Sequence, residues 1–172
     1  VIDRFAQIEP KVFVAMDKYS YGGKEFDKSE VIEAVVNAIP SIEKVVLISS
    51  APRIKIDHQL WSTIMKNRSA VLSFTRVEFN HPIWVLYSSG TTGLPKAITH
   101  SQGGILLEQL KYLTFHKDLQ PGETCFWYTT TGWMMWNHIQ ASLLCEGIMV
   151  LYDGSPAFPD LNVLWKFAAD TK

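Results

Sequence analysis

The 172-residue chain lacks most features that mark membrane, secreted and nucleic-acid-binding proteins. No uncharged apolar run reaches the roughly 18 residues of a membrane-spanning helix, and even the stretch 141–152 is interrupted by Glu146. The two cysteines, Cys125 and Cys145, fit no metal-ligand spacing, and we interpret them as buried thiols without a disulfide. The formal net charge of −1 provides no broad basic surface. We therefore expect no nucleic-acid partner, no membrane partner and no metal site.

Two common nucleotide-binding spacings are also missing. G-x-x-x-x-G-K-[ST] does not occur, because Gly90 and Gly93 are three residues apart and Ala97 follows Lys96. G-x-G-x-x-G is absent as well. The chain has instead a different loop, rich in hydroxyl groups and glycine: Tyr87-Ser88-Ser89-Gly90-Thr91-Thr92-Gly93-Leu94-Pro95-Lys96.

This loop has the chemistry of a phosphate-binding site. It follows the apolar run 83–87, which predicts a buried strand leading straight into it. Gly90 and Gly93 let backbone N–H groups approach an anion closely, and Lys96 adds a compact positive charge for β- and γ-phosphates. The alternative is an ordinary turn, which the density of hydroxyl groups beside a lysine disfavours. The predicted phosphate-binding residues are Ser88, Ser89, Gly90, Thr91, Thr92, Gly93 and Lys96.

The hydrophobic pattern predicts an α/β fold with a largely parallel sheet flanked by helices. In the first predicted helix, capped by Asp27 and ended by Pro40, an apolar stripe marks the buried face. That stripe consists of Val31, Ile32, Val35, Val36 and Ile39. The predicted strands are 12–16, 45–49, 83–87, 124–128 and 148–152, and the further predicted helices are 58–67, 101–115 and 133–145.

A second cluster of unusual residues, Thr130-Thr131-Gly132-Trp133-Met134-Met135-Trp136-Asn137, follows the predicted strand 124–128. We expect it at another strand end of the same sheet. Its tryptophans and methionines suit the apolar wall of a pocket, but each of them also suits the core of a helix, and the residues alone leave both interpretations open. His100 and His138 lie near the two motifs, and we interpret both as solvated or hydrogen-bonded side chains rather than catalytic bases.

The loop 87–96 resembles the phosphate-loop signature of the adenylate-forming superfamily, which includes acyl-CoA synthetases, luciferases and peptide-synthetase adenylation domains. The resemblance implies that a carboxylate attacks the α-phosphate of ATP, bound with Mg²⁺, to give an acyl-adenylate and pyrophosphate. In the CoA ligases of the superfamily, the thiol of CoA then displaces AMP. By position, Thr91, Thr92 and Lys96 would hold the β- and γ-phosphates, and Ala97 stands where many members have glycine.

The second cluster is similar to the Asp-x-Gly-Trp-x-x-Gly-His stretch of acetyl-CoA synthetase-like enzymes. Gly132 and Trp133 match it, whereas Thr131, Trp136 and Asn137 replace the aspartate, glycine and histidine. These departures from an acetate site imply a different short acid. The resemblance as a whole makes acetoacetate the first choice, with acetate, propionate or another short carboxylate as alternatives. The implied substrate-pocket residues are Gly132, Trp133, Met134, Trp136 and Asn137.

The resemblance covers essentially the whole chain. It implies that residues 1–172 are an internal part of an AMP-binding domain, without the C-terminal domain that carries the catalytic lysine. We expect a cytosolic enzyme of lipid metabolism, which uses ketone-body carbon, as the parent protein, and no catalysis by these residues alone. A different possibility is a truncated, non-catalytic interaction module with an exposed aromatic surface, and a stable monomer would count against it.

Overall fold

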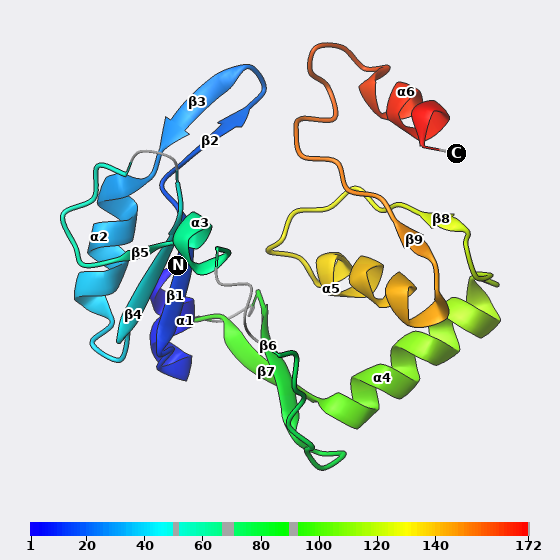
Figure 1. Cartoon of the computed structure of the whole chain (residues 1–172), viewed down its shortest axis with the longest axis horizontal. Helices are drawn as coiled ribbons and strands as arrows, with labels where there is room; N and C mark the ends of the chain where they lie inside the picture. Colours follow the sequence, from blue (N-terminus) through cyan, green and yellow to red (C-terminus); the bar gives the residue numbers. More distant parts are fainter. Residues whose placement is uncertain (50–51, 67–70, 90–92, 172) are drawn as a thin grey trace. The chain divides into compact units, whose positions relative to one another are not determined.

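The computed structural model describes residues 1–49, 52–66, 71–89 and 93–171 (Figure 1). The chain divides into two compact units. The first comprises Val1–Thr75 and Tyr87–Ala97, and the second comprises Arg76–Leu86 and Ile98–Lys172. No helix among the described residues combines the length and the apolar character needed to cross a lipid bilayer.

The first unit contains a parallel sheet in the order β1-β4-β5, formed by Val12–Met16, Lys44–Ile48 and Gln59–Leu60. Strand β1 is preceded by helix α1, Ile2–Phe5, and the 3-10 helix η1, Ala6–Ile8. Helix α2, Ser29–Ala38, lies between β1 and β4 in the sequence, as the crossover of a parallel pair requires. Its Ile32 packs in one buried cluster with Val45, Leu47 and Ile54.

Helix α2 largely confirms the sequence prediction, although its N-cap is Lys28 and the predicted cap, Asp27, lies one residue earlier. Ser29 donates its backbone N–H to the Asp27 carboxylate at 2.8 Å, so Asp27 satisfies an amide that has no partner within the helix. Hydrogen bonds from the backbone and then the side chain of Ser29 lower the pKa of Asp27. The predicted stripe is buried at Ile32, Val35 and Ile39, but Val31 is exposed, because it lies at the margin of the apolar face.

An antiparallel hairpin, formed by β2 (Lys18–Tyr21) and β3 (Lys24–Asp27), was not predicted. Its turn is Gly22-Gly23, with φ of 57° and 77°. Two successive residues with positive φ are typical of a type I′ turn, for which a Gly-Gly pair between short strands is a recognised sequence signal. The hydrophobic pattern did not predict the hairpin, because its strands are largely polar.

The predicted helix 58–67 was largely wrong. Within the described residues 58–66, Gln59–Leu60 forms strand β5, and only Trp61–Ile64 forms a single helical turn, α3. Asn67, the last residue of the predicted helix, lies outside the described residues. Val46 and Leu47 of β4 align with Gln59 and Leu60, so pairing with the buried central strand overrides the weak helical periodicity of this stretch.

Strands β6, Pro82–Ser88, and β7, Lys96–Ser101, pair with each other. β6 confirms the predicted strand 83–87, whereas β7 was not predicted because it is largely polar. The chain then enters helix α4, Gln102–Lys111, where Ser101 Oγ accepts a hydrogen bond from the Gly104 amide at 3.2 Å. A π-helical turn, η2, continues from Tyr112 to His116, so the predicted helix 101–115 is two joined segments.

The remainder of the second unit has short strands and helices around a small core. Strands β8, Thr124–Cys125, and β9, Ile148–Met149, pair in parallel. The predicted helix 133–145 is helix α5, Met134–Gln140, followed by the 3-10 helix η3, Ala141–Cys145. Helix α6 spans Val163–Asp170. Among the described residues of this unit, the buried ones are Gln109, Leu113, His138, Ile139, Ala141, Ser142 and Gly147.

The α/β class and its parallel pairings are confirmed, but the described strands belong to four small sheets. The expectation that 83–87 and 124–128 share one sheet was wrong. A strand extends only where a neighbouring backbone supplies hydrogen bonds. The β8–β9 pairing has Ile148 N bonded to Glu123 O and Val150 N bonded to Cys125 O, and it stops there, so 126–128 lies outside the strand.

Candidate functional site

The predicted phosphate loop connects the paired strands β6 and β7. Ser88 is the last residue of β6 and Lys96 is the first of β7. Ser88, Ser89, Gly93 and Lys96 are exposed, whereas Gly90, Thr91 and Thr92 lie outside the described residues. Gly93 has a φ of 153°, which a residue with a side chain rarely adopts. The described part therefore offers two hydroxyl groups, a glycine backbone and an ammonium group to solvent.

Both flanks of the loop contact the segment that begins the first unit. Tyr87 Oη donates a hydrogen bond to the Arg4 carbonyl at 2.7 Å. Gln7 Nε2 donates to the Pro95 carbonyl at 3.0 Å and to the Asp3 carbonyl at 2.7 Å. Partial burial raises the pKa of Tyr87, against the opposing effect of the Arg4 charge. The phenol therefore stays protonated and able to donate at neutral pH.

Within the second unit, β6 and β7 are joined by a pair of side chains. Trp84 Nε1 donates a hydrogen bond to His100 Nδ1 at 2.8 Å, and the two rings meet edge to face. Because an indole N–H only donates, Nδ1 of His100 must be the unprotonated nitrogen. This contact confirms the interpretation of His100 as a hydrogen-bonded side chain.

One of the predicted substrate-pocket residues, Asn137, lines a cavity of the second unit. This cavity is an apolar pocket of about 490 Å³, with Trp84, Gly103 and Leu106 among the neighbours of Asn137. Gly132, Trp133, Met134 and Trp136 are not part of that lining. Trp133, immediately before α5, is 70% exposed. Trp133 is the N-cap of α5 and has an extended backbone, so Gly132 and Trp133 lie outside the helix that carries Asn137.

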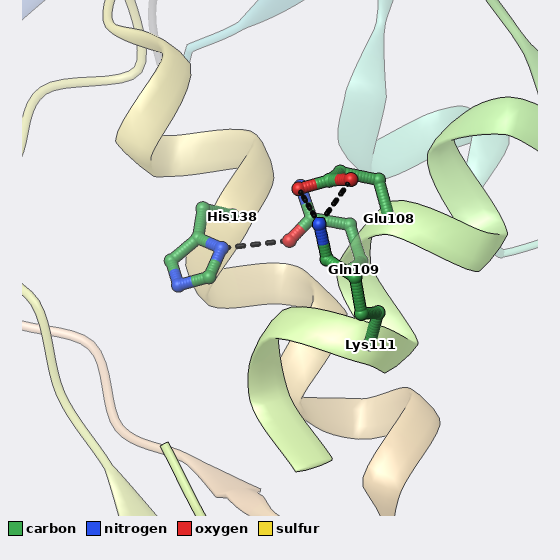
Figure 2. A network of polar contacts seen from close by, with 4 residues as sticks. All are labelled: Glu108, Gln109, Lys111 and His138. Atoms are coloured by element: carbon green, nitrogen blue, oxygen red, sulfur yellow. Dashed lines mark hydrogen bonds and ion pairs between the residues drawn. The ribbon is translucent and has the colours of Figure 1, made fainter. Parts of the chain in front are cut away.

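His138 forms a buried polar pair that the sequence did not reveal (Figure 2). Its Nδ1 lies 2.7 Å from Gln109 Oε1, and the Tyr112 ring meets the imidazole edge to face. An amide oxygen only accepts, so Nδ1 carries the proton. Burial, with a smaller effect of the Lys117 charge, lowers the pKa of His138. The two partners are 29 residues apart on α4 and α5, so no local pattern could have predicted their contact.

Other reactive groups offer no second centre within the described residues. Cys125 and Cys145 are half-buried free thiols, and burial raises the pKa of Cys125. In the part of the chain that the structure describes, no three carboxylate, imidazole or thiol groups come together as a metal site. The hydroxyl- and glycine-rich loop stays the predicted place for an anionic ligand.

The sequence matches the family of AMP-binding enzymes over residues 2–172, and the chain belongs to that family. It is 42% identical to the acetoacetyl-coenzyme A synthetase of Rhizobium meliloti, over 98% of this chain and 27% of that protein. It is 39% identical to the acetoacetyl-CoA synthetase of Gallus gallus, over 96% of this chain and 26% of that protein.

A solved structure supports the same family assignment. The acetoacetyl-CoA synthetase from Streptomyces lividans superposes with a TM-score of 0.90 at 47% identity, covering 97% of this chain and 26% of that one. The α/β fold is therefore that of part of an adenylate-forming enzyme. The chain spans about a quarter of the length of the curated relatives that it matches.

Proposed function

We propose that the gene product containing this chain is an acetoacetate–CoA ligase that forms AMP. The observation that carries the proposal is the similarity to acetoacetyl-CoA synthetases along nearly all of the chain, at 39–47% identity. In the proposed reaction a carboxylate oxygen of acetoacetate attacks the α-phosphorus of ATP, and pyrophosphate leaves. The sulfur of CoA then attacks the acyl carbon, and AMP leaves with the bonding electrons of the acyl–oxygen bond.

The loop between β6 and β7 would hold the phosphates. In this assignment Ser88, Ser89, Thr91 and Thr92 supply hydroxyl groups, and Gly90 and Gly93 supply backbone N–H groups. Lys96, exposed at the start of β7, neutralises charge that develops on the departing pyrophosphate. Hydroxyl oxygens suit Mg²⁺, which usually takes few protein ligands and several phosphate or water oxygens. When bound, Mg²⁺ would neutralise further phosphate charge.

The acid would bind near the stretch Gly132–Asn137. Trp136 and Asn137, both half-buried, give it bulk and an amide for hydrogen bonding. An amide can donate to the keto oxygen of acetoacetate, which acetate and propionate lack. A site built for that contact would leave the amide unpaired with the simpler acids, which supports acetoacetate as the preferred substrate.

The proposed activity belongs to a protein of the relatives' length. Residues 1–172 would supply the phosphate loop and part of the acid site, while the catalytic lysine would come from elsewhere in the longer protein. We therefore expect no acyl-adenylate formation by these residues alone. A cytosolic location and a role in directing ketone-body carbon to lipid synthesis belong to the same proposal.

The test is pyrophosphate release by the gene product with acetoacetate, acetate and propionate, each with Mg-ATP and CoA. We expect the largest kcat/KM with acetoacetate, and equal values for the three acids would contradict the proposed substrate. Lys96→Ala should lower kcat/KM for ATP by roughly 10- to 100-fold, because it removes a charge-assisted contact. Lys24→Ala, at an exposed lysine of β3, is the matched control and should retain activity.

A further inference from the structure

We propose that the segment Ile2–Ile8 is a brace for the phosphate loop, with Gln7 and Tyr87 as positioning residues that set its affinity for the phosphates of ATP. This inference rests on the proposed function, because it assigns a role in phosphate binding at that same loop.

The two contacts of the brace lie at opposite ends of the loop. Tyr87, the residue before Ser88, donates its hydroxyl hydrogen to the Arg4 carbonyl at 2.7 Å. Pro95, the residue before Lys96, accepts a hydrogen bond from the Gln7 side chain at 3.0 Å. The segment Ile2–Ile8 therefore holds the residue before Ser88 and the residue before Lys96.

The helical geometry of the segment explains how it reaches both ends. Arg4 and Gln7 are three residues apart across α1 and η1, and residues with that spacing lie on one face of such helices. The Gln7 amide also donates to the Asp3 carbonyl at 2.7 Å. This hydrogen bond fixes the Gln7 side chain in the orientation that reaches the Pro95 carbonyl. The Arg4 guanidinium lies 6.0 Å from the centre of the Tyr87 ring and adds a cation–π contact.

The segment is in turn fixed to the parallel sheet of the same unit. Phe5 meets Phe13 of β1 edge to face, with ring centres 6.3 Å apart. Phe13 packs against the buried cluster that contains Val45 and Leu47 of β4. A continuous set of contacts thus runs from the core of the first unit to both flanks of the loop.

Pre-positioning is the physical benefit of such a brace. A glycine-rich loop that binds phosphate must lose conformational entropy when the ligand orders it. Fixed flanks reduce that loss, because part of the ordering has already occurred in the free protein. Removing either contact should therefore weaken ATP and pyrophosphate binding while leaving the acid and CoA unaffected.

The test uses Tyr87→Phe and Gln7→Met in the gene product that contains this chain. Each change removes hydrogen-bond donation and keeps most of the side-chain volume. We expect the KM for ATP and the calorimetric Kd for pyrophosphate to rise roughly threefold in each variant, within the range for one hydrogen bond. The KM values for acetoacetate and CoA should stay at their wild-type values. Hydrogen exchange in peptides covering 87–96 should become faster.

Two matched controls remove similar hydrogen bonds elsewhere. Tyr152→Phe loses donation to the Ser155 carbonyl, and Gln120→Met loses donation to Asp118. Neither change should alter pyrophosphate binding or exchange in 87–96.

The outcomes separate the brace from the phosphate loop itself. If Lys96→Ala weakens pyrophosphate binding while Tyr87→Phe and Gln7→Met bind it like the wild type, the loop assignment holds and the brace is wrong. The brace is equally wrong if all three KM values rise together. If Lys96→Ala has no effect on pyrophosphate or ATP, the proposed function of the loop itself fails.

Discussion

At the scale of single residues, His138 has the most distinctive surroundings among the described side chains that titrate near neutral pH. Its imidazole is buried beside Gln109, Tyr112 and the charge of Lys117, and its pKa is lowered from the ordinary value of 6.5. The unfolded chain therefore binds a proton more readily than the folded one. We expect the free energy of unfolding to be fully retained above pH 6.5 and to fall as the pH drops from 6.5 through the lower pKa of the folded state.

Denaturant unfolding at several values between about pH 5 and pH 8 would measure this slope. His138→Gln provides the comparison, because an amide can still donate to Gln109 but does not titrate. Its stability should depend less on pH over that range. An unchanged slope in His138→Gln would mean that other groups cause the effect.

At the scale of elements, the hairpin β2–β3 depends on the backbone conformation of its turn. Gly22 has a φ of 57°, and a Cβ added there would meet no atom within 4 Å. Strain alone should therefore decide the effect of a substitution. Gly22→Ala should destabilise the hairpin by about 1 kcal/mol, because most side chains disfavour the left-handed region. Gly22→Asn should cost less, since asparagine tolerates that region.

Hydrogen exchange of the β2–β3 amides, compared with those of α2 as an internal control, would measure the effect on the turn. The two variants should differ in β2–β3 and agree in α2. Equal protection in Gly22→Ala and Gly22→Asn would show that the φ of Gly22 does not limit the stability of the hairpin.

The elements that the sequence predicted are those with strong local patterns. Helix α2 has a cap and an apolar stripe, and β1, β4 and β6 have apolar β-branched runs. The hairpin β2–β3 and strand β7 were missed although their partners are near in sequence, because their strands are largely polar, whereas β5, β8 and β9 depend on distant partners. β5 forms because β4 lies beside it, and β8 and β9 pair for only two residues each. Propensity within a short window carries little information about such pairings.

At the scale of the whole molecule, the candidate site also has a part that the local sequence predicts and a part that depends on contacts between distant residues. The phosphate-binding role of the loop 87–96 is a prediction from its composition, because phosphate chemistry needs those residue types close together in sequence. The contacts of Tyr87 with Arg4 and of Gln7 with Pro95 join positions more than 80 residues apart and leave no sequence signal. The apolar pocket beside Asn137 likewise depends on packing between α4 and α5.

The exposed apolar side chains predict how residues 1–172 behave when expressed alone. Phe115, Leu161 and Trp165 of the second unit are each close to 80% exposed. On α6, Phe167 packs against Phe126 with ring centres 5.0 Å apart, while Trp165 points elsewhere, because residues two apart lie on different faces of a helix. Burying one such side chain contributes roughly 2 kcal/mol. We therefore expect concentration-dependent self-association, measured by sedimentation velocity.

Trp165→Ser should raise the dissociation constant of the self-associated form by roughly tenfold, since a large aromatic side chain often dominates an interface. Its thermal unfolding should change little, because the indole makes little contact in the monomer. Lys166→Ser, at the exposed neighbouring position of α6, is the matched control and should associate like the wild type. A monomer at every concentration would contradict this prediction and would also argue against a role for these residues alone as an interaction module.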